Sequence, residues 1–290
     1  MNIFLFIRWD VDPEIFHIGP LSIRWYSLMF IVSFLLGMQI FRKMVIREGK
    51  PAQLYENIFW PVALATLLGA RLGHFLFYEP AALIHNPLEV LLPPYKGLAS
   101  HGAAAGILIG LYYFSRKNRV PYLWTLDRIV ITVALSGFFI RIGNLMNSEI
   151  IGYETTVPWG FILVNAPEAG MVARHPTQIY EALANLSIFA ALYLIYLRKK
   201  PPFRDGVIFG MFLILLFGAR FFIEFLKERQ ESFEKAMTLD MGQLLSLPLV
   251  AAGIVLLWKI RKKGWTVPQI AAHPENKLNA ERKIKGKAKH

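Results

Sequence analysis

Long apolar stretches alternate with short charged segments along most of this 290-residue chain. An α-helix needs roughly 17–25 mostly apolar residues to cross a bilayer. Seven stretches meet this requirement: Trp25–Phe41, Ile58–Phe77, Leu98–Phe114, Ile129–Met146, Ile179–Leu197, Gly206–Leu226 and Met241–Trp258. The pattern predicts an all-α polytopic membrane protein with seven transmembrane helices, the third of which is short and rich in alanine and glycine.

The segments between these stretches carry unequal numbers of positive charges. Residues 42–57, 115–128, 198–205 and 259–263 share one side of the predicted membrane and hold 16 of the 32 lysines and arginines, whereas the segments on the other side hold 7. Loops rich in lysine and arginine remain in the cytoplasm. We therefore expect the N-terminus outside and the C-terminus in the cytoplasm.

This topology divides the chain into three parts. Residues 1–24, where aromatic and acidic residues are mixed, are predicted to form an interfacial N-terminal arm. Residues 25–263 form the seven-helix domain, and their segment 147–178 is long for a connection within a bundle, so we expect a small extracytoplasmic head there. Residues 264–290 form a basic cytoplasmic tail. We expect this tail to be disordered and to contact anionic membrane lipids rather than nucleic acid.

Three arginines stand inside apolar stretches: Arg71, Arg141 and Arg220. An arginine in bilayer hydrocarbon costs at least ~2.5–3.5 kcal/mol, so such residues usually face a protein interior or an anionic ligand. The predicted helix directions place all three near the outer face. Other polar residues share this level: Tyr26, His74, His101, Asn144, His175, Tyr180, Glu181 and Glu224. Because the inner halves of the helices hold almost nothing ionisable, the distribution predicts a polar site near the outer leaflet.

Some of these residues also have simpler explanations when taken singly. Arg71 can extend past His74 to the headgroups, which is the interpretation we favour for it. Arg220 and Glu224 can form an i,i+4 ion pair, which explains that pair as well as a ligand does. The group as a whole favours a site. Arginine is the preferred side chain for bidentate phosphate recognition, so an anionic phospholipid is the expected ligand.

Several kinds of chemistry are disfavoured by what the chain contains. It has no cysteine, and its seven histidines occur singly, so we expect neither a cysteine nucleophile nor a metal or other cofactor. No Gly-x-Ser-x-Gly nucleophile or paired aspartates indicate an intramembrane protease. A phospholipid transporter or a lipid-binding membrane protein without chemistry is the alternative function, although no polar path crosses the inner halves.

The segment Arg141–Gly152 reads R-I-G-N-L-M-N-S-E-I-I-G and resembles the signature of the prolipoprotein diacylglyceryl transferase family. Further matching motifs follow in order over about Asp12 to Trp258: Ile18–Tyr26, His101-Gly102, Pro158–Gly160, Arg174–Glu181, Arg220–Phe225 and Met241–Ser246. Two positions depart from the family pattern. Ala103 stands where the family commonly has glycine, and Phe217 stands where it often has tyrosine, which removes a hydroxyl from the expected site.

The resemblance implies an enzyme of the bacterial cytoplasmic (inner) membrane with its active site near the outer leaflet. Such enzymes transfer the diacylglyceryl group of phosphatidylglycerol to the thiol of the lipobox cysteine in the signal peptide of a preprolipoprotein. The product is a thioether and glycerol phosphate leaves, which is the first step of bacterial lipoprotein maturation. The expected partners are therefore phosphatidylglycerol, preprolipoprotein signal peptides and membrane lipids.

Roles for individual residues follow from this reaction. Arg141 and Arg220 are expected to bind the headgroup and to stabilise the leaving phosphate. His101 is our candidate for the general base that deprotonates the thiol, with His175 or no dedicated base as alternatives. The predicted substrate-binding residues are Tyr26, Asn144, Asn147, Glu149, Gly152, His175, Glu181 and Glu224.

Overall fold

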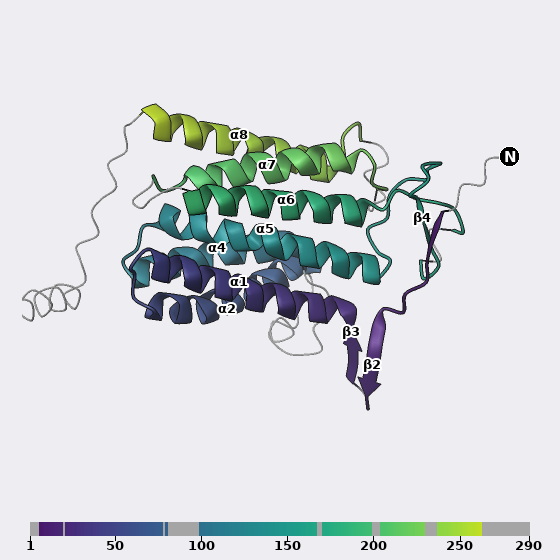
Figure 1. Ribbon diagram of the computed structural model, residues 1–290, viewed down its shortest axis with the longest axis horizontal. Helices are drawn as coiled ribbons and strands as arrows, with labels where there is room; N and C mark the ends of the chain where they lie inside the picture. Colours follow the sequence, from purple (N-terminus) through teal and green to yellow (C-terminus); the bar gives the residue numbers. More distant parts are fainter. Residues whose placement is uncertain are drawn as a thin grey trace, which may run out of the picture.

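The computed structural model describes residues 6–19, 21–77, 79–80, 99–166, 170–198, 204–229 and 237–262. Its helices run side by side as a bundle, and short strands gather at one end, which we call the head end (Figure 1). The helices are α1 (Trp25–Arg47), α2 (Gln53–Phe77), α4 (Ser100–Lys117), α5 (Tyr122–Met146), α6 (Thr177–Arg198), α7 (Val207–Glu224) and α8 (Met241–Lys262). The strands are β1 (Ile7–Trp9), β2 (Glu14–Ile18), β3 (Leu21–Arg24) and β4 (Phe161–Leu163).

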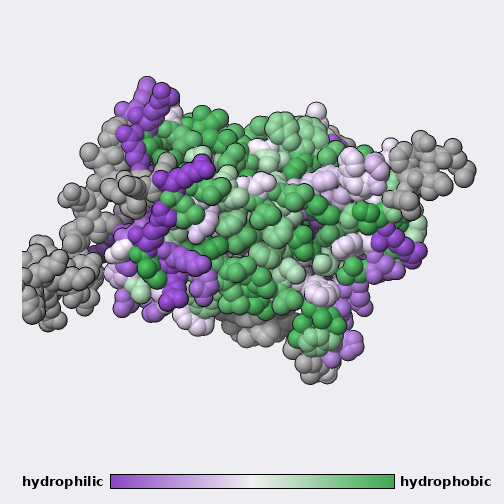
Figure 2. Space-filling model, viewed as in Figure 1, coloured by the Kyte–Doolittle hydropathy of each residue, from purple (hydrophilic) through white to green (hydrophobic). Residues whose placement is uncertain are grey.

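Six of the seven helices in the described part of the chain are long and apolar enough to cross a membrane, and α4 falls outside this set. Large apolar side chains are exposed along the bundle, among them Leu35, Trp60, Ile109, Phe222 and Ile254. Figure 2 shows the result, a hydrophobic middle flanked by hydrophilic residues at the two ends. Such a surface suits lipid rather than water. The protein is therefore a helical, multi-pass membrane protein, as predicted.

Helix α4 is rich in alanine and glycine, and these small residues allow it to pack closely against α2. A Cβ atom added to Gly102 would fall on the carbonyl oxygen of Gly69, and one added to Gly106 would fall on that of Ala65. A Cβ atom on Gly73 would lie 2.7 Å from the Cα of Gly102. Small residues allow membrane helices to approach in this way. The glycines of the third apolar stretch are thus explained by backbone contact between two helices.

The N-terminal segment is joined to the loop between α5 and α6. Strand β1 pairs in parallel with β4, and the indole nitrogen of Trp9 donates a hydrogen bond to the carbonyl of Leu145 at 3.0 Å. Strands β2 and β3 form an antiparallel hairpin that leads directly into α1. The periodic pattern of the sequence predicted none of these strands, because segments of three to five residues carry too little alternation. The interfacial position of residues 1–24 stays a prediction, and the tail 264–290 lies outside the described residues.

A buried charge cluster lies at the end of the bundle opposite the head. The guanidinium of Arg128 donates to both carboxylate oxygens of Glu48, at 2.9 and 3.0 Å, and to Asp205 at 3.2 Å. Asp127 accepts hydrogen bonds from the backbone amides of Gly206 and Phe209, at 2.8 and 2.7 Å, and so caps α7. We call Glu48, Asp127, Arg128 and Asp205 the opposite-end cluster.

This cluster corrects two expectations from the sequence. Helix α5 begins at Tyr122 rather than near Ile129, so Asp127 and Arg128 stand inside a helix and not in a loop. The halves of the helices remote from the head also hold ionisable groups, since both of these residues are buried. Hydropathy alone treats such charges as loop residues, because it contains no information about the partners that make their burial possible.

Candidate functional site

The pair Arg141 and Glu181 joins α5 to α6 at the head end. Arg141 Nε lies 2.9 Å from Glu181 Oε2, and the arginine side chain is 19% exposed while the glutamate is 5% exposed. One turn below, a Cβ atom on Gly137 would fall on the amide oxygen of Asn185, so the two helices touch there. Asn185 in turn donates to the carbonyl of Glu181 at 2.7 Å. The close helix contact therefore fixes where the Glu181 carboxylate meets Arg141.

Glu149 collects the asparagines of the Arg141–Gly152 segment. Its Oε1 accepts hydrogen bonds from the side-chain amides of Asn144 and Asn147, at 3.1 and 3.0 Å. The oxygen of the Asn144 amide accepts from Arg141 Nη1 at 3.3 Å. The four polar residues predicted from this segment thus form one hydrogen-bonded group around the end of α5.

Strained backbone holds Glu149 in place. Ser148 and Ile150, the residues on either side of it, have positive φ angles of 54° and 60°. This conformation is costly for a non-glycine residue and most costly for a β-branched one, and it tends to occur at functional sites. The start of α6 secures the strained turn, since Gln178 Nε2 donates to the carbonyl of Glu149 at 2.7 Å and the Thr177 hydroxyl donates to that of Ile150 at 3.1 Å.

Gly152 allows three segments to meet. A Cβ atom at this position would fall on the carbonyl oxygen of His175 and lie 2.9 Å from that of Leu226. The amide of Tyr153 donates to the carbonyl of Leu226 at 2.9 Å, and Gly152 and Lys227 form an antiparallel bridge. The sequence motif therefore requires glycine for packing, because no larger residue fits between the backbone segments that contain His175 and Leu226.

Lys227 completes a series of alternating charges across the head end. Its Nζ lies 3.5 Å from Glu181 Oε1 and 3.3 Å from Glu224 Oε2, and the Glu224 carboxylate lies 3.8 Å from Arg220 Nε. The series runs from Arg141 through Glu181, Lys227 and Glu224 to Arg220, and we call these five residues the head-end network. In the sequence, Lys227 falls among the seven cations of the predicted outer segments, and that position did not mark it as a member of the site. The available signal was its i,i+3 spacing from Glu224.

The predicted ion pair between Arg220 and Glu224 is confirmed, yet it leaves much of the arginine accessible. The Arg220 side chain is 40% exposed, against 12% for Glu224. A guanidinium has five N–H donors in a planar fork. One long contact at 3.8 Å therefore leaves Arg220 able to bind an anion.

Tyr26 lies in the first turn of α1, against the segment that carries Arg141. A Cβ atom on Gly143 would lie 2.9 Å from Cδ2 of Tyr26, so the absence of a side chain at residue 143 admits the tyrosine ring. The Tyr26 ring therefore contacts α5 at residue 143, which is two residues after Arg141 and one residue before Asn144. The role of Tyr26 in substrate binding stays a prediction.

The two candidate bases lie in different surroundings. His101 is exposed on the first turn of α4, and no hydrogen bond or ion pair joins it to the head-end network within the described ranges. His175 Nδ1 lies 3.2 Å from the hydroxyl of Tyr180, which accepts a hydrogen bond from the indole of Trp159 at 2.8 Å. The structure therefore brings Arg141, Arg220, Glu181 and Glu224 into one network, and it leaves both histidines outside that network.

Arg71 is fully buried, so the predicted extension to the headgroups is wrong. Only 1% of the residue is exposed, and its guanidinium lies over the ring of Phe75 at 4.8 Å. A guanidinium that is buried in this way does not reach the membrane surface. His74, one turn along α2, pairs instead with Glu79 at 3.4 Å.

Arg174 is a second cation of the predicted outer loops that has a specific structural role. It is buried, and its Nη1 donates to the carbonyl of Gly152 at 3.1 Å and to Glu228 at 2.7 Å. It therefore secures the backbone of the head around Gly152. Among the residues that the structure describes, no three histidine, aspartate or glutamate side chains are grouped to hold a metal ion.

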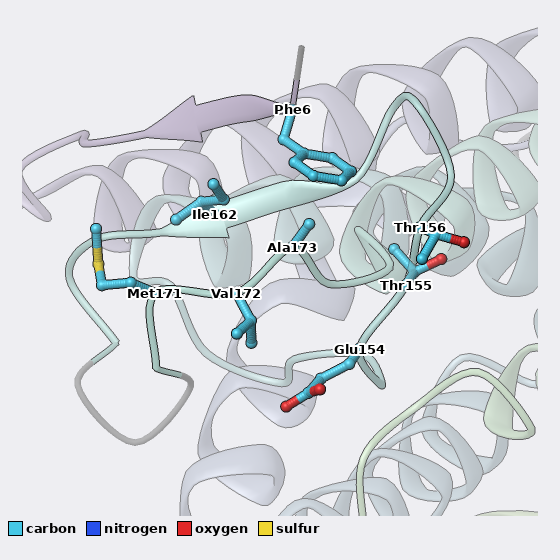
Figure 3. Close-up of a pocket in the computed structure, with 8 residues that line it drawn as sticks. All are labelled: Phe6, Glu154, Thr155, Thr156, Ile162, Met171, Val172 and Ala173. Carbon is cyan, nitrogen blue, oxygen red and sulfur yellow. The ribbon is translucent and has the colours of Figure 1, made fainter. Parts of the chain in front are cut away.

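A cavity of about 610 Å³ lies within the head and shares no residue with the head-end network. Its lining residues are Phe6, Glu154, Thr155, Thr156, Ile162, Met171, Val172 and Ala173. In Figure 3, Phe6 and Ile162 lie on the strand side, and Met171 lies at the end remote from Thr155 and Thr156. The cavity has a mainly apolar lining and no cation. It is therefore a poor candidate for binding a phosphate group.

Comparison with known proteins supports the assignment made from the motifs. The model of the family described as prolipoprotein diacylglyceryl transferase matches residues 13–259. A protein of Tolumonas auensis is 39% identical over 250 residues, which cover 86% of this chain and 95% of the relative. A protein of Chloroherpeton thalassium is 39% identical over 259 residues, which cover 89% of this chain and 96% of the relative. A protein of Porphyromonas gingivalis is 41% identical over 270 residues, which cover 89% of this chain and 95% of the relative. All three are named phosphatidylglycerol–prolipoprotein diacylglyceryl transferases.

Proposed function

The chain belongs to the prolipoprotein diacylglyceryl transferase family, and we propose that it transfers the diacylglyceryl group of phosphatidylglycerol to the lipobox cysteine of preprolipoproteins. A carbon–sulfur bond forms at a glycerol carbon and the carbon–oxygen bond to phosphate breaks. The electron pair of that bond leaves with glycerol phosphate, and the thiol proton passes to a base. The observation that carries this proposal is the head-end network, which presents two arginines on different helices with part of each side chain accessible.

Arg141 and Arg220 supply the electrostatic part of this reaction. Negative charge accumulates on the leaving phosphate as the bond to carbon breaks, and guanidinium groups bind phosphate oxygens through paired hydrogen bonds. Donors that are already in place before the reaction stabilise such charge at little further cost. The carboxylates of Glu181 and Glu224 orient the two arginines. Tyr26 and the group of Asn144, Asn147, Glu149 and Gly152 then shape the binding site around them.

A base must remove the thiol proton, because a cysteine has a pKa of about 8.5 and only its thiolate is a good nucleophile. We assign this role to His101, which is exposed at the head end of α4. His175 is the alternative. His101→Gln retains size and polarity but accepts no proton, so turnover is expected to fall by ~100-fold or more. A near-normal rate and pH profile for this variant, with a large loss for His175→Gln, would transfer the role to His175.

The proposed topology has seven spans, with the head and N-terminus outside the bacterial cytoplasmic (inner) membrane and the site near the outer leaflet. The cations at the helix ends opposite the head support it, since Arg42, Lys43, Arg116, Lys117 and Arg261 all lie in the final turns of α1, α4 and α8. A reporter active only in the cytoplasm should work when fused to the C-terminus and fail when fused after Asn165. Activity of the second fusion would overturn the orientation.

Mass spectrometry of the product tests the function directly. Purified protein is incubated with phosphatidylglycerol and a peptide that contains a lipobox cysteine, and the peptide is then weighed. We expect the mass of one diacylglyceryl group to be added, and we expect no addition when the cysteine is replaced by serine. A peptide of unchanged mass would favour the alternative, a lipid transporter or lipid-binding protein without chemistry.

A further inference from the structure

Lys227 is a buried cation, although its segment lies between two predicted membrane spans and would be expected at the surface. It follows α7, and its side chain is 6% exposed, with Nζ between Glu181 and Glu224. A buried ammonium group is costly unless it is paired, and two carboxylates around it exceed what one cation needs. The structure therefore uses Lys227 to hold two acidic side chains together.

Each of those carboxylates also holds one arginine. Glu181 lies 2.9 Å from Nε of Arg141, which stands on α5, and Glu224 lies 3.8 Å from Nε of Arg220, which stands on α7. Two cations cannot pair with one another, so the spacing between the arginines depends on the anions that hold them. Those anions repel each other as well. The positive charge of Lys227 is what allows them to stay close together.

The backbone around Lys227 is fixed independently of its side chain. The amide of Lys227 donates to the carbonyl of Glu224 at 3.1 Å, and the amide of Glu228 donates to that of Ile151 at 3.0 Å. The bridge between Gly152 and Lys227 adds a link to the head. A substitution that changes only the side chain will therefore leave the backbone path in place.

Helix α8 limits where the Glu224 carboxylate can move. A Cβ atom on Gly242 would fall on Glu224 Oε1, so the carboxylate is packed directly against the helix backbone. With this route closed, Glu224 retains the two cations that it already contacts, Arg220 and Lys227.

We propose that Lys227 is a positioning residue that couples Arg141 to Arg220 through Glu181 and Glu224, so that both guanidinium groups meet one phosphate. The inference rests on the proposed function. It assigns Lys227 no contact with the substrate. Its contribution is to the arrangement that stabilises the leaving group, so it affects the chemical step more than the binding of phosphatidylglycerol.

The test compares two substitutions at residue 227 with one at a matched lysine. Lys227→Met keeps the length of the side chain and removes the charge, whereas Lys227→Arg keeps the charge. Lys50→Met is the control, because Lys50 is a half-buried lysine at the opposite end, 4.9 Å above the ring of Trp124. Rates of diacylglyceryl transfer are measured against phosphatidylglycerol concentration, together with the midpoint of thermal unfolding in detergent.

We expect Lys227→Met to lower kcat and kcat/KM together, by about 10- to 100-fold, which indicates a loss confined to the transition state. Lys227→Arg should recover most of the rate, and Lys50→Met should match the unmodified protein. A normal kcat in the folded Lys227→Met protein would overturn the proposal, even if its thermal midpoint fell. An arginine variant no better than the methionine variant would also overturn it.

A charge-balanced variant covers the case in which Lys227→Met does not fold. Lys227→Met combined with Glu181→Gln removes one charge of each sign, so the net charge of the head-end network is the same as in the unmodified protein. The proposal requires this protein to lose at least 10-fold in kcat, because Arg141 is no longer linked to Arg220, and full activity would contradict it. Product formation by the unmodified protein tests the transferase function separately, since that result does not depend on residue 227.

Discussion

The two ends of the bundle both bury charged clusters, and the two clusters differ in how completely their arginines are occupied. At the opposite end, Arg128 is 3% exposed and donates to Glu48, to Asp205 and to the carbonyl of Trp124. At the head end, Arg220 is 40% exposed, and among the described residues its buried Nε has no hydrogen-bond acceptor, only the long ion pair to Glu224. An arginine whose donors are occupied holds helices together, whereas one with donors left over can bind an anion.

Burial of a charge is therefore a weak guide to function in this protein. The opposite-end cluster is the more deeply buried of the two, and its geometry is the better one, with a bidentate contact between Arg128 and Glu48. In the head-end network only the contact between Arg141 and Glu181 is equally short, the other contacts are 3.3–3.8 Å long, and the two arginines are more exposed than Arg128. Its incomplete pairing is the feature that supports the proposed binding site, and this difference between the ends can be tested by removing the same type of residue from each end.

The largest expected effect is on stability, for Arg128→Met. Removing one partner of a buried, hydrogen-bonded ion pair leaves the other partner uncompensated and costs about 3–5 kcal/mol. We expect the protein level in the membrane to fall and the midpoint of thermal unfolding to drop sharply. The molecules that remain folded should transfer diacylglyceryl groups at a normal rate. A folded, stable variant that has lost turnover would contradict the structural role of this cluster.

Arg141→Ala should show the opposite behaviour. Loss of one donor to a developing anion costs roughly 10²–10³-fold in kcat, or about 2.7–4 kcal/mol. Because Arg141 is 19% exposed, its removal should alter the thermal midpoint far less than Arg128→Met does. Arg141→Lys keeps the charge but loses the planar fork, so we expect an intermediate rate. Normal turnover in a well-folded Arg141→Ala protein would remove the central assignment of the site.

The helices and the head-end arginines could be predicted from the sequence, because length and hydropathy identify membrane spans and an arginine inside a span is unusual. The ion pairs between side chains could not be predicted. Lys227 and Arg128 look like loop charges in a hydropathy pattern, and only the carboxylates around them explain their burial. The same limit applies to Arg71, because its burial over the ring of Phe75 is not visible in the hydropathy pattern.

The head shows a further limit of a pattern-based prediction. Strands β1 and β4 are each three residues long and pair across about half of the chain. Segments of that length have no measurable periodicity. The loop 147–178 was recognised by its length, but its partner, the N-terminal strand, carried no signal of its own. Long-range pairing of short segments was thus the least predictable part of the fold.

A smaller effect is expected at the contact between α8 and the head-end network. Gly242→Ala places a methyl group against the Glu224 carboxylate, which is 12% exposed and closely packed. Displacement of Glu224 should disturb Arg220 and lower turnover about 10-fold, equivalent to ~1.4 kcal/mol. Gly218→Ala is the matched control, because a Cβ atom on that α7 glycine meets nothing within 4 Å. Equal rates for the two variants would show that Glu224 tolerates the shift.

The smallest effect sharpens the comparison from the opposite end, through Asp205. Burial raises the pKa of the Asp205 carboxyl above its ordinary value of 3.8, and the guanidinium of Arg128 offsets only part of that rise. A carboxyl whose pKa is higher in the folded state than in the unfolded state stabilises the fold fully below the unfolded pKa. That contribution is lost as the pH rises through the folded pKa. Asp205→Asn does not titrate and should not show this loss.

We therefore expect the thermal midpoint of Asp205→Asn, measured relative to the unmodified protein, to improve as the pH is raised from about 4 towards 7. The change should be at most a few degrees, since ~1 kcal/mol shifts the midpoint of a chain of this size by about 2–4 °C. Both proteins are compared in the same detergent at each pH. A relative midpoint that worsens with rising pH would mean that ionised Asp205 stabilises Arg128 by more than its burial costs. The opposite-end cluster would then depend on Asp205 as well as on the bidentate contact to Glu48.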